Sequence, residues 1–206
     1  MPLDAVIVAD PVGEDRIIED LISARIPVIT DRSVEGRPGA CWVDVDVVAA
    51  VRETLDHFEA QGARRPALVL PDSPTRFYAG VFAPEAGNGP VVEAVEVALS
   101  GTCRPDALCV VPEASPPLVL EAARRHGYDV PGDLLVVCVS EDATATHTRP
   151  ALSTLSLRPQ EVAEAGIDLL VAALEQGGAP SAGVLVQTRL EVRASSLRTD
   201  TGAGTD

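Results

Sequence analysis

The residues best placed to bind a ligand are acids and hydroxyls that come directly after apolar runs. Ser140-Glu141-Asp142 follows the run Leu134 to Val139, and Asp72 follows Ala67 to Leu70. Such runs predict buried strands, and ligands bind at the carboxyl ends of the strands in open α/β sheets. Carboxylates and hydroxyls there can bond the polar groups of a ligand, because buried polar groups must find hydrogen-bond partners. The sequence therefore favours a polar small-molecule site.

Motifs that would indicate an enzyme are absent from the sequence. The three histidines are not arranged at a catalytic or metal-binding spacing, and His147 is at best a residue at the rim of a pocket. The chain has no Gly-x-Gly-x-x-Gly, no Walker loop and no Gly-x-Ser-x-Gly. The four cysteines form no C-x-x-C pair. We therefore expect no catalytic residues, no metal and no cofactor.

Composition limits the partners of the chain. Its 206 residues carry a formal net charge of −15, and aromatic residues make up only 3%. An acidic surface repels phosphate backbones, and few aromatics are present to stack on bases. We therefore expect no direct contact between this chain and nucleic acid.

The elements that must position these residues alternate between strand and helix. Apolar runs separated by helical spacing predict an α/β fold with mostly parallel sheets. A helix is expected from about Asp46 to a stop at Gly62, with Val47, Val48, Val51, Leu55 and Phe58 facing inward. Val184 to Val192 predicts one last strand. The apolar runs are too short to cross a bilayer and no signal peptide is visible, so we expect a cytoplasmic protein without membrane contact.

Several segments resemble the LacI/GalR bacterial transcription repressors. The closest is Gly127-Tyr128-Asp129-Val130-Pro131-Gly132-Asp133, a strand, and then Arg149-Pro150-Ala151-Leu152-Ser153-Thr154. It is similar to the family's "G-x-x-V-P-x-D" and "P-x-L-T-T" segments. Leu190 to Ser196 resembles the family's "L-x-x-R-x-S" ending, and Leu3 to Val8 resembles its third strand. The resemblance implies a two-lobed, type I periplasmic-binding-protein-like fold with a truncated N-terminal lobe.

The resemblance also implies a binding site for a sugar-like effector. Glu113 stands where the family carries an acid after a strand. Arg76 corresponds to a ligand-binding Arg of the family's "Arg-x-x-Gly-Phe" segment, although the glycine follows Arg76 one residue later than in that segment. Ser140 stands where the family has its second carboxylate, and Glu141 could substitute for it. The candidate ligand-binding residues are therefore Glu113, Ser140, Glu141, Arg76 and Asp72.

The expected domains follow from the same resemblance. Residues 1–70 correspond to a partial N-terminal lobe, residues 71–196 to a C-terminal lobe shortened near 71–90, and residues 197–206 to a disordered tail. The helix-turn-helix and the first two strand–helix units of the family have no counterpart in this sequence. We therefore expect contact with operator DNA only through the missing helix-turn-helix. A homodimer is expected.

Four interpretations remain open at this point. The first is the effector-binding and dimerisation domain of a LacI-type regulator. The second is a stand-alone solute-binding protein, against which the missing signal peptide argues. The third is an α/β enzyme, which has no supporting motif. The fourth is a degenerate relative without a ligand, which the Ser140 replacement favours.

Overall fold

The computed structural model describes residues 3–9, 11, 16–32, 40–70, 89–111, 115–177 and 183–198. The chain divides into two compact units. Unit 1 consists of Met1–Val47 and Arg158–Thr188, and unit 2 of the remaining residues, Val48–Leu157 and Arg189–Asp206. The chain therefore passes between the units three times.

This division differs from the expected boundary at residue 70. Residues 48–70, expected in the N-terminal lobe, belong to unit 2, and residues 158–188, expected in the C-terminal lobe, belong to unit 1. The reason is that each sheet pairs strands that lie far apart in the sequence. A parallel neighbour is reached through a crossover connection, so a late strand can pair with an early one. Here the late strand β8 pairs with β3.

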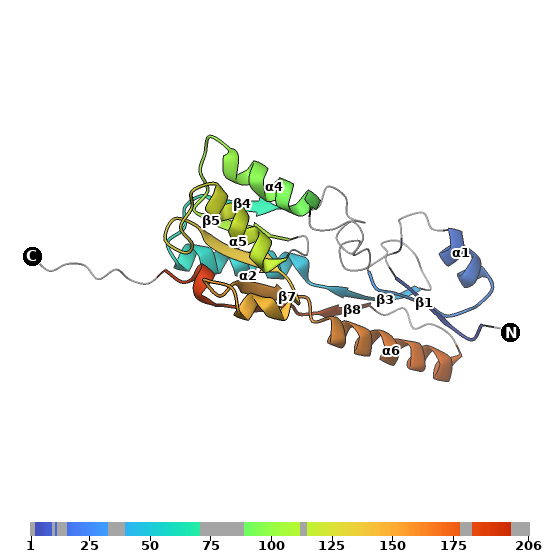
Figure 1. Ribbon diagram of the computed structural model, residues 1–206. Coiled ribbons are helices and arrows are strands. Elements are labelled where there is room, and N and C mark those ends of the chain that lie inside the picture. The colour runs from blue at the N-terminus through green and yellow to red at the C-terminus, as the bar shows by residue number, and fades with distance from the viewer. Residues whose placement is uncertain are drawn as a thin grey trace, which may run out of the picture. The chain divides into compact units, whose positions relative to one another are not determined.

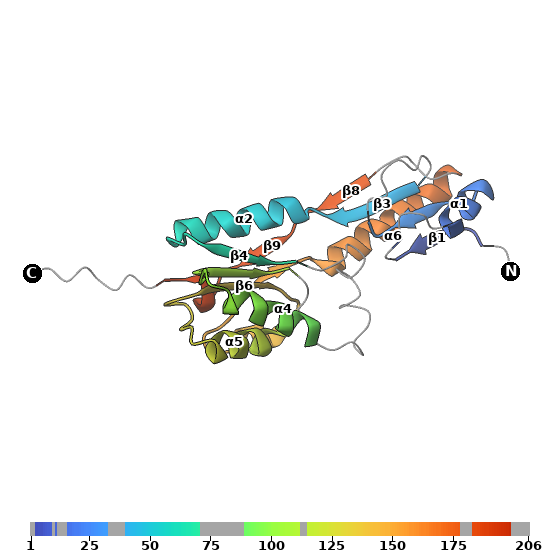
Figure 2. The ribbon, with the colours of Figure 1, turned by 90° about the horizontal axis from the view of Figure 1, so that it is seen from above.

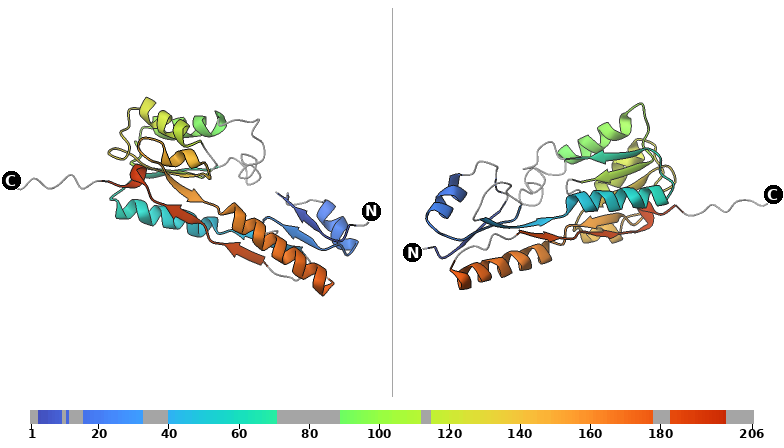
Figure 3. Two further views of the ribbon diagram at one scale, coloured as in Figure 1. Left: turned by 60° about the horizontal axis from the view of Figure 1, so that its bottom comes forward. Right: turned by 180° about the vertical axis from the view of Figure 1, so that it is seen from behind.

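Unit 1 contains a parallel sheet, whose described strands lie in the order β1, β2, β3 and β8; Figure 1 labels β1, β3 and β8. These strands are Val6–Val8, Val28–Thr30, Ala40–Val45 and Gly183–Val186. Helix α6 (Pro159–Gln176) packs along the strands, and α1 (Arg16–Ser23) contacts β2 (Figure 3). Gly183 lies opposite Trp42, and a Cβ atom there would come within 2.0 Å of the Trp42 ring. Only glycine fits at this position.

Unit 2 contains a second sheet, in which the described strands lie in the order β4, β5, β6, β7 and β9. They are Pro66–Val69, Ala107–Val110, Leu135–Val139, Ser153–Ser156 and Arg189–Glu191. The first four are parallel, and only β9, among the described strands, pairs antiparallel to its neighbour. The expected α/β fold with mostly parallel sheets is confirmed.

Helices cover both faces of this second sheet (Figure 2). Helices α4 (Gly89–Ser100) and α5 (Pro116–Arg125) pack on one face, over Leu108, Val136 and Cys138. Helix α2 (Val47–Ala60) packs on the other face, over Cys109 and Val137. Strands β5 and β6 are buried along their whole length, which explains their continuous apolar sequences.

Helix ends match the sequence signals closely. Gly62, Gly127 and Gly177 follow α2, α5 and α6 with φ angles of 79°, 72° and 71°, a left-handed conformation that favours glycine. The prediction of one strand from Val184 to Val192 is wrong. The chain crosses between the units after Thr188, so the apolar segment divides into β8 in unit 1 and β9 in unit 2.

The described chain continues past the expected start of the tail at residue 197. Leu197 donates its N–H to the Ala194 carbonyl, at the 3-10 helix η3 (Ala194–Ser196). The Arg198 N–H bonds Gln61 Oε1, and its guanidinium reaches the carbonyls of Gln61 and Asp106. Residues 199–206 lie outside the described residues.

Candidate ligand-binding site

Ser140 and Glu141 lie at the carboxyl end of β6, as the sequence predicts. Ser140 is buried, with an exposed fraction of 3%, and its hydroxyl accepts a hydrogen bond from the Asp142 N–H at 3.2 Å. The exposed Glu141 carboxylate accepts bonds from Ser156 Oγ at 2.9 Å and from the Leu157 N–H at 2.8 Å. Glu141 therefore fastens the end of β6 to the end of β7, immediately before the chain leaves unit 2.

Asp142 begins the short 3-10 helix η2 (Ala143–Thr146). Its side chain accepts a hydrogen bond from the Thr144 N–H at 2.8 Å, the usual arrangement of an N-cap residue. Thr148 closes the following loop, because its hydroxyl shares its hydrogen between the carbonyl oxygens of Ala145 at 2.9 Å and Pro150 at 2.8 Å. The Ser140–Asp142 turn is thus held by its own side chains.

Three of the five candidate residues, Asp72, Arg76 and Glu113, lie outside the described residues. The strands that precede them in the sequence are described and belong to the second sheet. Asp72 follows the end of β4 in the sequence, Glu113 follows the end of β5, and Ser140 follows β6 directly. These three strands are parallel and adjacent in the sheet, so their carboxyl ends meet at one edge.

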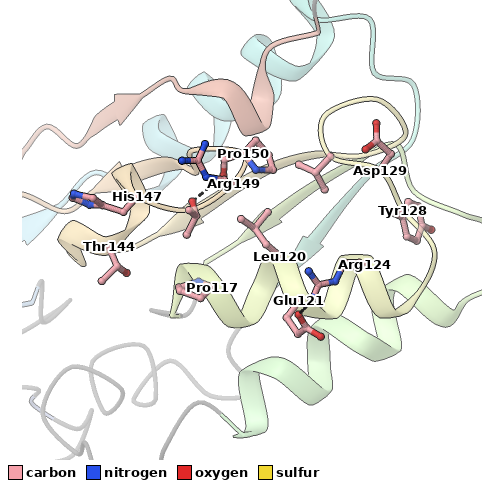
Figure 4. A pocket seen from close by; sticks show the side chains of 12 residues that line it. Pro117, Leu120, Glu121, Arg124, Tyr128, Asp129, Thr144, His147, Arg149 and Pro150 are labelled. Atoms are coloured by element: carbon pink, nitrogen blue, oxygen red, sulfur yellow. Dashed lines mark hydrogen bonds and ion pairs between the residues drawn. The ribbon is translucent and has the colours of Figure 1, made fainter.

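A cavity of about 480 Å³ lies beside α5 in unit 2 (Figure 4). It is bounded by α5, by the turn after α5, and by the loop that follows η2. Its charged lining includes Arg124, which is ion-paired with Glu121, and Arg149. Of the candidate residues that the structure describes, neither Ser140 nor Glu141 lines it. His147, assigned from the sequence to a pocket rim at best, does line this cavity.

The C-terminal segment that resembles "L-x-x-R-x-S" forms a polar network buried at the edge of the second sheet. Ser195 Oγ donates to the Val136 carbonyl at 2.7 Å and accepts the Ser153 N–H at 2.8 Å. Arg193 donates to Leu152 O and to Thr154 Oγ1, both at 2.8 Å. Ser195 is fully buried. These groups hold β7 in place, and β7 in turn presents Ser156 to Glu141.

Cysteine chemistry is limited by burial. Burial raises the pKa of the Cys109 thiol to about 12, and burial followed by the nearby Cys109 raises the pKa of Cys138 well above its usual value. Both side chains pack in the core on opposite faces of the sheet. Such thiols are protonated and unreactive at neutral pH.

Two features are absent from the described part of the chain. There, no group of three or more His, Cys, Asp or Glu side chains is arranged to hold a metal ion. No helix within the same residues combines the length and apolarity needed to cross a membrane.

Comparison with known proteins gives consistent relatives. A family model described as "Periplasmic binding protein-like domain" matches residues 55–196. The catabolite control protein A of Staphylococcus xylosus is 22% identical over 201 residues, covering 87% of this chain and 60% of that protein. The lactose operon repressor of Rhizobium radiobacter is 31% identical over 95 residues, covering 46% of this chain and 83% of that protein.

Solved structures share the fold. A regulatory protein of LacI family from Chloroflexus aggregans has a TM-score of 0.75 at 21% identity, and the match covers 93% of this chain and 76% of that one. The transcriptional regulator CelR, in complex with cellobiose, has a TM-score of 0.76 at 21% identity, with 93% and 65% covered. The chain spans 60% of the length of the catabolite control protein.

Proposed function

The chain belongs to the periplasmic-binding-protein-like sensor domains of LacI-family transcription regulators, and from this premise we propose that it binds a small effector and dimerises to control DNA binding. The effector we propose is a sugar or a related metabolite. The CelR complex with cellobiose and the similarity to a lactose operon repressor support this class. Because transcription regulators act on DNA in the bacterial cytoplasm, we propose a cytoplasmic location for the protein.

One observation carries the proposal. Strands β4, β5 and β6 are parallel neighbours, and each is followed in the sequence by a candidate polar residue, namely Asp72, Glu113 and Ser140. A parallel sheet collects such residues at its carboxyl edge, where ligands of open α/β sheets bind. We propose Glu113 as the acid that accepts bonds from effector hydroxyls, with Ser140 and Arg76 as further partners.

Glu141 takes a different part in this proposal. Its carboxylate is already bonded to Ser156 Oγ and to the Leu157 N–H. A carboxylate has about four lone-pair sites, so Glu141 can still accept a bond from a ligand. We propose that it supports the Ser140 turn and contacts the effector only at its remaining sites.

A thermal-shift screen tests the proposal. Cellobiose, lactose, ribose and a set of nucleosides are added to the purified chain, and a compound at 100 times its dissociation constant should stabilise it by about 2.7 kcal/mol. Glu113→Gln should abolish the shift. Glu53→Gln, which changes an exposed acid on α2, should leave the shift unchanged.

The dimer is tested separately, through the mass of the purified chain in solution. Regulators that read paired half-sites are two-fold symmetric, which supports a homodimer as the working form. Light scattering should give twice the chain mass of 21.5 kDa. A mass of one chain at all concentrations tested would contradict this part of the proposal.

The alternative is a domain of this fold that binds no effector. It is favoured by the Ser140 turn, whose hydroxyl and neighbouring carboxylate are both bonded within the protein. If the folded protein shows no thermal shift with any compound of the panel, that result favours this alternative over a sensor.

A further inference from the structure

A second cleft, of about 350 Å³, lies at the opposite edge of the sheet of unit 2, where the strands begin. It is lined by Arg65, Arg104, Pro105, Gly127, Tyr128 and Asp133. Arg65 immediately precedes β4, and Arg104 lies shortly before β5. The candidate effector residues follow the carboxyl ends of these same strands, so the two sites are separate.

The two arginines are held in place by bonds that use only part of their donor capacity. Arg65 donates its Nε–H to the Arg104 carbonyl at 2.8 Å. Arg104 donates one Nη–H to the Gly127 carbonyl at 3.3 Å, and its guanidinium lies 4.1 Å from the centre of the Tyr128 ring. A guanidinium has five N–H donors in a fixed fork, so most donors of both side chains stay available.

The backbone of Arg65 is fixed as well. The Asp106 carboxylate accepts the N–H of Arg65 at 2.7 Å and the N–H of Arg64 at 2.9 Å. This clamp fixes the start of the Arg65 side chain at the mouth of the cleft. An arginine with a positioned backbone loses less freedom on binding a ligand than one on a mobile loop.

Tyr128 forms part of the wall of the cleft. Its side chain is almost fully buried, with an exposed fraction of 6%, and its hydroxyl has no hydrogen-bond partner in the described structure. The hydroxyl oxygen has no accessible surface, so Tyr128 contributes its ring, on which the Arg104 guanidinium lies, and not its hydroxyl. The ring thereby holds the Arg104 side chain at the cleft.

The charge of the cleft selects the ligand. Two arginines and one carboxylate, Asp133, give the lining a formal charge of +1 in a chain whose net charge is −15. One Asp133 oxygen already accepts the Asp129 N–H at 3.0 Å. The remaining N–H donors of two arginines suit an anionic group with several oxygens, and a phosphate group offers more acceptor oxygens than a carboxylate.

We propose that this cleft, formed by Arg65, Arg104 and Tyr128, binds a phosphate group, either as free phosphate or as a small phosphate monoester. A water molecule occupies about 30 Å³ in the liquid, and the cleft of about 350 Å³ is many times larger. A single phosphate, which is only a few times the size of a water molecule, therefore does not fill it. This leaves room for the organic part of a monoester. The proposal does not depend on the effector site, because it shares no residue with it.

Calorimetric titration and phosphorus NMR line broadening of the full chain test it. The probes are inorganic phosphate, glycerol 3-phosphate and, as a neutral control, glycerol, all at constant ionic strength. We expect saturable binding of at least one phosphate compound and none of glycerol. Tighter binding of glycerol 3-phosphate identifies a monoester as the ligand, and equal binding identifies free phosphate.

Variants locate the binding. Arg65→Gln and Arg104→Gln should each weaken it at least tenfold, and Tyr128→Phe, which keeps the ring under Arg104, should weaken it less. Arg52→Gln changes an exposed arginine on α2 and should leave the affinity unchanged. Non-saturating binding, or equal affinity in all four variants, would mean an adventitious ion only and would overturn the proposal.

Discussion

At the residue scale, Asp106 shows how one carboxylate organises the start of two strands. Burial by itself would raise the pKa of Asp106, but hydrogen bonds from the N–H groups of Arg65 and Arg64 and the charges of Arg65 and Arg198 outweigh it. The net effect is a pKa below its usual value. The ionised form is therefore the one that the folded protein stabilises.

The stability of the protein should consequently depend on pH through Asp106. A carboxyl whose pKa is lower in the folded state stabilises the protein above its unfolded pKa, and this contribution is lost as the pH falls through the folded pKa. Asp106→Asn should lower the free energy of unfolding at pH 7. Its difference from wild type should shrink as the pH drops below about 3.8, the ordinary value.

Urea denaturation at a series of pH values measures this difference. Asp56→Asn, at an exposed position on α2, is the matched control and should change stability little at any pH. A gap between Asp106→Asn and wild type that stays constant at acidic pH would contradict the assignment.

The cysteines give a second prediction at this scale. Cys103 is exposed, whereas Cys41, Cys109 and Cys138 are buried. Only a thiolate that a reagent can reach is alkylated, so burial and a raised pKa both protect the core thiols. Mass spectrometry after iodoacetamide treatment should find Cys103 modified in the native protein and all four in urea. Rapid native modification of Cys109 or Cys138 would show that the sheet is open.

At the scale of elements, the sequence predicted where helices end better than which faces they bury. Gly62 marked the end of α2 in the sequence because the positive φ angle that it adopts is a local property. Helix α2 was expected to bury Val48 and Leu55, and that expectation is wrong. Val48 is 69% exposed and Leu55 38%, while Ala50, Thr54 and Phe58 are buried.

The reason is that apolar residues occur on more than one side of α2. Small residues let a helix approach a sheet closely, and Thr54 can be buried because its hydroxyl donates to the Ala50 carbonyl at 2.9 Å. The choice of face is made by the sheet that α2 covers, which is a long-range property. The division of the last strand between two sheets has the same kind of cause.

The candidate site was predictable to a similar extent. The Ser140 turn follows from a local pattern, a buried strand ended by polar residues. The bonds from Ser156 and Leu157 to Glu141 join positions 15 and 16 residues apart, and no spacing rule reveals them. The cleft formed by Arg65, Arg104 and Tyr128 had no sequence signal either, because these residues come from three separate loops between helices and strands.

The buried network around Ser195 gives a prediction for the element β7. Ser195→Ala removes the oxygen that accepts the Ser153 N–H and donates to the Val136 carbonyl, and all three residues are buried. An unsatisfied buried group costs about 1–3 kcal/mol, so the variant should lose about that much stability. Ser100→Ala, at an exposed serine, should stay within about 0.5 kcal/mol of wild type in urea denaturation. Equal stability of the two variants would contradict the assignment.

At the scale of the whole molecule, two units are joined by three crossings of the chain. Each sheet therefore contains segments from distant parts of the sequence, and neither unit is a continuous stretch. Glu141 is bonded to Ser156 and Leu157, the last residues before one of these crossings. The turn that we propose for effector binding is thus directly bonded to a connection between the units.

The proposed function depends on where an effector binds. Hydrogen–deuterium exchange of the full chain, with and without the sugar that gives the largest thermal shift, measures this directly. We expect slower exchange in the peptides that follow β5 and β6, which contain Glu113 and Ser140, and unchanged exchange in the cavity segment from Thr144 to Pro150. Slower exchange confined to the cavity segment, with no change around Glu113 and Ser140, would contradict it.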